Sequence, residues 1–120
     1  MIIGTGIDII EISRIKSLLK NERFLLKMFT NNEIEYLKSR GPESTAGYFC
    51  AKEAVAKCLG TGFSGFNFTD IEILKKNSAP YVILHGEAAQ IAQNKKITHI
   101  CISISHCKEY ATAMAIAQEG

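Results

Sequence analysis

The hydrophobic and polar positions along the chain follow two periods, which predict a mixture of strands and helices. Alternation with a period of two, with many β-branched residues, predicts strands over 2–10, 70–76, 81–85, 97–105 and 110–117. Apolar residues at helical spacing, and a capping box that begins at Thr30, predict helices over 11–20, 30–39, 44–59 and 87–94. No repeat or domain boundary is visible, so we expect residues 1–120 to form a single α+β domain. Its antiparallel sheet would pack on one long buried helix.

The segment 44–59 is apolar over most of its circumference, which is typical of a buried helix. Its only charged residues after Glu43 are Lys52, Glu53 and Lys57. At 100° per residue these three fall within a sector of about 140°, so we expect them to form one charged strip. A glycine-rich segment, 60–65, follows and is expected to begin by capping the helix.

Asp8 is a carboxylate on a strand of otherwise apolar or small residues. Alternation places it on the same face as Gly4 and Gly6, so we expect open space beside the charge, which suggests a ligand. Mg²⁺ takes one or two carboxylates together with substrate phosphates, so Asp8 and Glu53 are candidate metal ligands. The alternative is that Asp8 caps the next helix and Glu53 pairs with Lys57. Spacing alone favours neither.

Composition limits the class of protein. Hydrophobic residues make up 47% and charged residues 22%, which is typical of a globular chain and not of a disordered one. The first residues lack the basic start of a signal peptide, and no uncharged apolar stretch approaches the roughly 20 residues that span a bilayer. We therefore expect a cytoplasmic protein with no membrane partner. Its 4 cysteines are then expected to be reduced thiols.

The charge of the chain is mildly positive and unevenly distributed. A net charge of +2 is too small to indicate nucleic acid as a partner. Basic residues gather between 11 and 28, however, and they are Arg14, Lys16, Lys20, Arg23 and Lys27. Such a helical surface can steer an acidic partner, or can simply be a solvated face, and charge alone favours the solvated face.

Two further groups could contact a phosphate. Lys57 precedes Gly60-Thr61-Gly62 by less than one turn, although this segment does not match a P-loop. His106 follows the strand that carries Ser105, and it could bond a phosphate or be merely exposed. A serine hydrolase is disfavoured because the chain has no G-x-S-x-G motif.

Three blocks of the sequence together resemble a known family. They are residues 4–12 around Asp8, residues 49–62 with Lys52-Glu53 and the glycine turn, and residues 102–106 ending at His106. They are similar to the short, single-domain holo-acyl-carrier-protein synthases among the 4′-phosphopantetheinyl transferases. That family moves phosphopantetheine from coenzyme A to a serine of apo acyl carrier protein and releases adenosine 3′,5′-bisphosphate. Its members are typically homotrimers with active sites between subunits.

The resemblance implies a role for each candidate residue. Asp8 and Glu53 would hold Mg²⁺ on the coenzyme A diphosphate, with Lys57 offsetting its charge. Glu53, directly or through a metal-bound water, would be the base for the carrier serine that attacks the β-phosphate. Coenzyme A contacts are expected from Gly60, Thr61, Gly62, Ser105 and His106. Docking of the acidic carrier is expected from Arg14, Lys20 and Arg23.

The chain departs from the family at two positions that usually carry a positive charge. Tyr48 stands where the family usually has arginine, and Ser78-Ala79 stands where it usually has Gly-Lys. Both replacements remove a positive charge, and the loss of the arginine is expected to weaken binding of the nucleotide phosphates. Cys50 replaces a more usual alanine, which is conservative for packing.

Two other functions fit parts of the same pattern. One is a non-catalytic trimeric module that binds a nucleotide or a partner and regulates another protein. It does not require carboxylates at both 8 and 53. The other is Mg²⁺-dependent hydrolysis of a small phosphate ester, which needs no carrier protein.

Overall fold

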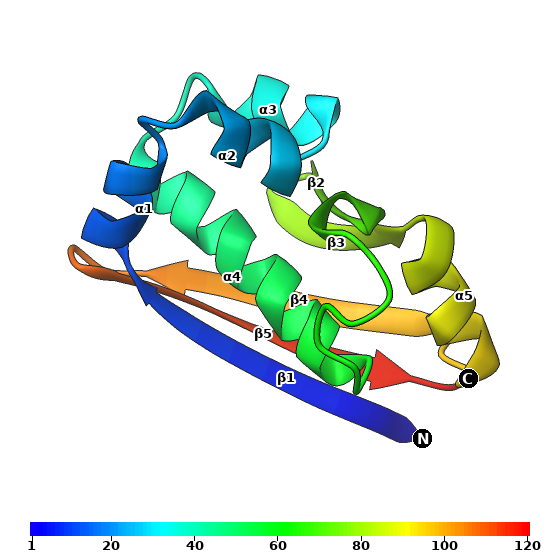
Figure 1. Cartoon of the computed structure of the whole chain (residues 1–120). Helices are drawn as coiled ribbons and strands as arrows, with labels where there is room; N and C mark the ends of the chain where they lie inside the picture. Colours follow the sequence, from blue (N-terminus) through cyan, green and yellow to red (C-terminus); the bar gives the residue numbers. More distant parts are fainter.

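Two antiparallel sheets and one long helix form the framework of the protein (Figure 1). The computed structural model describes residues 1–120. The elements in chain order are β1 (Ile2–Glu11), α1 (Ile12–Leu18), α2 (Glu22–Met28), α3 (Asn31–Leu37), α4 (Pro42–Cys58), the 3₁₀ turn η1 (Phe68–Asp70), β2 (Ile71–Lys76), β3 (Ala79–Leu84), α5 (Gly86–Asn94), β4 (His99–His106) and β5 (Tyr110–Gln118). The expected α+β class, antiparallel sheet and long buried helix are confirmed.

The three-stranded sheet has the order β1-β5-β4, and α4 crosses one of its faces (Figure 1). The central strand presents only small side chains to the helix: Ala111, Ala113, Ala115 and Ala117, all buried. Isoleucines at 100, 102 and 104 of β4 pack against the same core, as the alternation predicted. Small residues on the sheet therefore allow α4 to lie close to the strands.

Gly4 and Gly6 serve this close packing. A Cβ on Gly4 would overlap the carbonyl oxygen of Cys58, and a Cβ on Gly6 would overlap that of Ala54. The expectation that these glycines leave open space for a ligand beside Asp8 is therefore wrong. The backbone of α4 fills that space, and only glycine admits it.

The charged strip expected on α4 is also partly wrong, because Lys52 is not on it. Lys52 is completely buried and its ammonium lies 2.7 Å from the Glu33 carboxylate. It also donates to the carbonyl of Phe68 at 3.0 Å and to that of Ile71. Because burying an ammonium without partners is very unfavourable, this lysine tightly joins α4 to α3 and β2.

The observed helix and strand bounds differ from the predicted ones at two places, where a helix cap and a tight turn set them. The sequence predicted one helix over 11–20 and none over 22–28, whereas α1 ends at Leu18 and α2 begins at Glu22. Asn21 starts α2, since its side chain accepts a hydrogen bond from the backbone N–H of Arg23 at 3.0 Å. The β2–β3 turn contains only Asn77 and Ser78, with φ of 52° and 69°. This tight turn brings the start of β3 forward to residue 79.

No helix of the protein combines the length and the apolar character needed to cross a membrane. The 4 cysteines are all unpaired, two of them buried and two exposed.

Candidate active site

The central cluster of the predicted site lies where α4 crosses the free edge strand β1. Asp8 is half-buried on the face of β1 that packs against α4. The ammonium of Lys57 donates to the carbonyl of Ile7 at 2.7 Å and lies 3.4 Å from Oδ1 of Asp8. The Thr112 hydroxyl donates to the Asp8 carbonyl at 2.7 Å and fixes the strand at this point. The fold thus brings together Asp8 and Lys57, which are 49 residues apart in sequence.

Glu53 belongs to the same cluster, since the charges of both Asp8 and Lys57 affect its pKa. Burial raises the pKa of the Glu53 carboxyl, the negative charge of Asp8 raises it further, and Lys57 opposes both effects. Two carboxylates that repel each other in a half-buried place are what a divalent cation would stabilise. The alternative in which Glu53 merely pairs with Lys57 is not supported, since the lysine ammonium bonds to β1.

The donor set fits Mg²⁺ better than a metal enclosed entirely by protein. No group of three or more His, Cys, Asp and Glu side chains in the protein could hold a metal ion. Asp8 and Glu53 offer carboxylate oxygens alone, and other coordination positions would fall to water and substrate. Mg²⁺ is usually bound through one or two carboxylates and substrate phosphates, with several waters retained.

The glycine turn lies at the end of α4 that carries Lys57. Gly60 and Gly62 have φ of 85° and 58°, a conformation that favours glycine. The Lys95 ammonium donates to the carbonyl of Leu59 and satisfies the end of the helix. Thr61 is exposed beside the two glycines. The fold therefore places Gly60, Thr61 and Gly62 on the same side of the protein as Lys57.

Ser105 and His106 lie apart from the cluster of Asp8, Glu53 and Lys57. They end β4, which is the opposite edge of the sheet from β1, with β5 between them. His106 lines a cavity of about 220 Å³ with residues from the first turns of α4 and from β2 and β3. Within one chain, the structure does not bring His106 to Asp8. The predicted site is therefore divided into two parts on opposite sides of α4.

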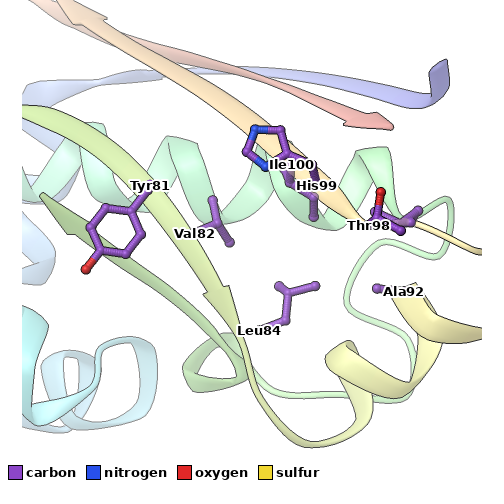
Figure 2. A pocket seen from close by; sticks show the side chains of 8 residues that line it. Tyr81, Val82, Leu84, Ala92, Thr98, His99 and Ile100 are labelled. Atoms are coloured by element: carbon purple, nitrogen blue, oxygen red, sulfur yellow. The ribbon is translucent and has the colours of Figure 1, made fainter. Parts of the chain in front are cut away.

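A second cavity, of about 360 Å³, holds none of the predicted residues (Figure 2). It lies between β3, β4 and α5, and its lining is mostly apolar: Tyr81, Val82, Leu84, Ala92, Ile97, Thr98, His99 and Ile100. It contains no carboxylate and no lysine or arginine, so it offers nothing for a metal or a diphosphate.

The basic residues expected to dock a carrier are all exposed, on the first two helices and on the connection between them. Arg14 is on α1, Arg23 is on α2, and Lys20 lies in the short connection between them. Because β1 runs directly into α1, this surface begins only a few residues after Asp8 (Figure 1). The basic surface therefore follows Asp8 closely along the chain.

Comparison with known proteins places the chain in a family. Residues 4–115 match the model of the 4′-phosphopantetheinyl transferase superfamily. The chain belongs to this superfamily. The holo-[acyl-carrier-protein] synthase of Alkaliphilus metalliredigens is 53% identical, with the match covering 98% of this chain and 99% of the relative. That of Caldicellulosiruptor saccharolyticus is 48% identical, over 99% and 98%.

Solved structures agree with this assignment. The Helicobacter pylori holo-[acyl-carrier-protein] synthase in complex with coenzyme A superposes with a TM-score of 0.85 at 33% identity, over 95% of this chain and 99% of that one. The Bacillus anthracis enzyme in complex with CoA (3′,5′-ADP) gives 0.84 at 34% identity, over 100% and 99%. The family predicted from the sequence is confirmed, and this member is an enzyme of the phosphopantetheinyl transferase class.

Sequence reasoning missed two charged residues that line the His106 cavity, Glu43 and Lys75. Neither was among the candidates. For Lys75 the one signal is position, since Lys75 lies on the same face of β2 as Ile71 and Ile73. Burial gives no signal, because Glu72 is buried as well and Lys75 is exposed.

Proposed function

We propose that this enzyme transfers the 4′-phosphopantetheine group of coenzyme A to a serine of apo acyl carrier protein, with Mg²⁺ as cofactor. The products are holo acyl carrier protein and adenosine 3′,5′-bisphosphate. The Asp8–Glu53 pair beside Lys57 carries the proposal, since two carboxylates and a lysine would suit a metal ion and a diphosphate in a chain related to holo-[acyl-carrier-protein] synthases. A cytoplasmic location, as expected from the sequence, is part of the same proposal.

The chemistry assigns a task to each of the three side chains. Mg²⁺ held by Asp8 and Glu53 would neutralise charge on the diphosphate. The serine hydroxyl oxygen forms a bond to the β-phosphorus, and the bond from that phosphorus to the oxygen of the adenosine 5′-phosphate breaks. Glu53 accepts the serine proton, directly or through a water, and its raised pKa suits a base. Lys57, with a side chain 51% exposed, can turn to the leaving phosphate.

Assembly with other copies of the chain would complete this site. The sheet face turned away from α4 exposes large apolar side chains, among them Ile7 (67% exposed), Ile9 (65%) and Met114 (41%). Exposed apolar residues gathered on one face are typical of an interface. A homotrimer that buries this face would allow His106 of one subunit to approach Asp8 of another, which one chain cannot achieve alone.

The exposed basic surface suits the acidic carrier protein. Arg14, Lys20 and Arg23 are exposed on and between α1 and α2, and Leu26 of α2, 65% exposed, would add an apolar contact. Charge complementarity would accelerate encounter and would weaken at high salt. The proposal requires neither nucleic acid nor a membrane.

A carrier-modification assay tests the function. Incubation with coenzyme A, Mg²⁺ and several bacterial-type apo carrier proteins is expected to add one phosphopantetheine mass to the carrier, as measured by mass spectrometry. Replacing Arg14, Lys20 and Arg23 together by glutamate should raise the KM for the carrier and leave the KM for coenzyme A within about twofold.

Other outcomes of that assay distinguish the alternatives. Metal-dependent binding of coenzyme A without any mass gain on any carrier would support a non-catalytic binding module and reject the transferase. Release of free phosphopantetheine in the absence of a carrier would indicate a hydrolase.

A further inference from the structure

Lys95, at the end of α5, reaches the end of α4, where the glycine turn of Gly60, Thr61 and Gly62 begins. Its ammonium donates a hydrogen bond to the carbonyl of Leu59, the last residue before the turn. The same ammonium lies against Gly60, where an added Cβ would come within 2.7 Å of the lysine Nζ. Gly60 therefore admits the ammonium because it carries no side chain. The roles proposed for Asp8, Glu53 and Lys57 do not involve Lys95.

The backbone that carries Lys95 is fixed by the way in which α5 ends. The N–H of Lys96 donates to the carbonyl of Gln93 at 3.0 Å. The N–H of Ile97 donates to the carbonyl of Ala92 at 2.9 Å. With Lys96 in the left-handed conformation, at φ of 63°, these two bonds form a Schellman motif. The side chain of Lys95 therefore starts from a well-defined point next to the glycine turn.

The middle of the glycine turn packs against little else. A Cβ placed on Gly62 would meet no heavy atom within 4 Å, and the Thr61 hydroxyl bonds only to the carbonyl of Gly62, at 3.0 Å. Phe63 follows the turn, and its ring stacks on that of Phe68 with centres 3.7 Å apart. The position of the turn therefore depends on Lys95 at its start and on Phe63 at its end.

The end of α4 is an unfavourable place for an anion unless a cation is present. The last carbonyls of a helix carry a partial negative charge, which repels phosphates. The Lys57 ammonium is turned towards β1, where it donates to the carbonyl of Ile7 at 2.7 Å. Lys95 is therefore the cation that meets the carbonyl of Leu59 directly. No carboxylate lies within ion-pair distance of Lys95, so its charge is free to offset the end of the helix.

We propose that Lys95 is a positioning residue for coenzyme A, which fixes the glycine turn and offsets the negative end of α4 so that the turn can receive the anionic substrate. The inference rests on the proposed function and on the coenzyme A contacts expected from Gly60, Thr61 and Gly62. It gives Lys95 no covalent step, since the ammonium keeps its proton and its bond to Leu59. Loss of Lys95 should therefore weaken coenzyme A binding and leave the chemical step unchanged.

Substitutions of two neighbouring lysines test the proposal. Lys95→Met removes the ammonium and keeps most of the stem. It is expected to raise the KM for coenzyme A about tenfold, while kcat and the KM for the carrier stay within about twofold. Lys95→Arg should restore most of the affinity, since a guanidinium also donates to a carbonyl. Lys96→Met is the matched control, because Lys96 is the next residue, is exposed and makes no ion pair.

A purely structural role for Lys95 gives a different result. Lys95→Met would then melt at a lower temperature and contain a smaller fraction of active enzyme, which lowers kcat and leaves the KM for coenzyme A unchanged. That result would overturn the inference. Equal KM values for coenzyme A in Lys95→Met and Lys96→Met would overturn it as well.

Calorimetry of coenzyme A binding, with Mg²⁺ and without a carrier, separates this inference from the transferase. If no carrier is modified but Lys95→Met binds coenzyme A about tenfold more weakly than Lys96→Met, the transferase fails and the role of Lys95 stands. If carriers are modified and the two variants bind coenzyme A equally, the role of Lys95 fails and the transferase stands. Absence of coenzyme A binding by the unmodified protein would reject both.

Discussion

Asp8→Asn and Glu53→Gln are each expected to lower kcat/KM for carrier modification by at least about a thousandfold, because each removes one of the two carboxylates proposed to hold the metal. Neither change should unfold the protein. Asp8 makes a single side-chain ion pair, at 3.4 Å to an exposed lysine. The pKa of Glu53 is raised by burial and by Asp8, so its charged form is disfavoured in the folded state. A neutral glutamine at 53 should therefore leave stability unchanged or slightly higher near neutral pH.

Transfer rates and thermal melting, measured on the same samples, check this pair of expectations. Glu87→Gln is the control, since Glu87 is an exposed acid at the start of α5, far along the chain from both carboxylates. It should behave as the unmodified protein in both measurements. Transfer that survives in either Asp8→Asn or Glu53→Gln would remove the carboxylate pair from the mechanism.

Mixing two inactive variants extends the same experiment to the subunit arrangement. If His106 of one subunit serves the Asp8 site of another, Asp8→Asn and His106→Ala should form mixed trimers in which some sites are intact. Activity should then reappear on mixing, and sedimentation should show a mass of three chains. Failure to recover activity in mixed trimers would place both residues in the site of a single chain.

The strands and the acids at positions 8 and 53 were accessible from sequence because they depend on local patterns. Alternation gave the faces of β1 and β4, and an acid in an apolar context singled out Asp8 and Glu53. Which element packs against a face of a strand depends on the tertiary fold and not on the local sequence. Gly4 and Gly6 therefore suggested a ligand space that the backbone of α4 occupies.

The ion pair between distant residues was not predicted from the sequence, for a similar reason. Nothing local distinguishes Lys52, which is buried, from Lys57, which is exposed one turn and one residue later. The partner of Lys52 is Glu33, which the sequence identified only as the second member of a capping box. Glu33 does cap α3, and its other oxygen accepts the backbone N–H of Ile73 at 2.8 Å.

Lys52→Met is expected to be among the most destabilising single substitutions of a charged residue in this protein. It leaves the Glu33 carboxylate completely buried without its counter-ion, and breaking a buried pair in this way costs about 3–5 kcal/mol. Urea denaturation followed by circular dichroism measures the loss. Lys38→Met is the matched control, because Lys38 pairs with Glu35 on the surface, where ion pairs contribute roughly 0–1 kcal/mol.

The pH dependence of this loss identifies its cause. Burial raises the pKa of Glu33 above the ordinary 4.5, and the positive charge of Lys52 is the main effect that opposes it. Without Lys52 the pKa should rise further, so Glu33 takes up a proton in the folded state at a pH where the unfolded chain has lost it. The destabilisation by Lys52→Met should therefore be largest near neutral pH and should shrink as the pH falls towards 4.5. Glu33→Gln in the Lys52→Met background should recover part of the stability at pH 7, since it removes the unpaired charge. A loss independent of pH, not relieved by that second change, would indicate lost packing of the lysine stem instead of an unpaired carboxylate.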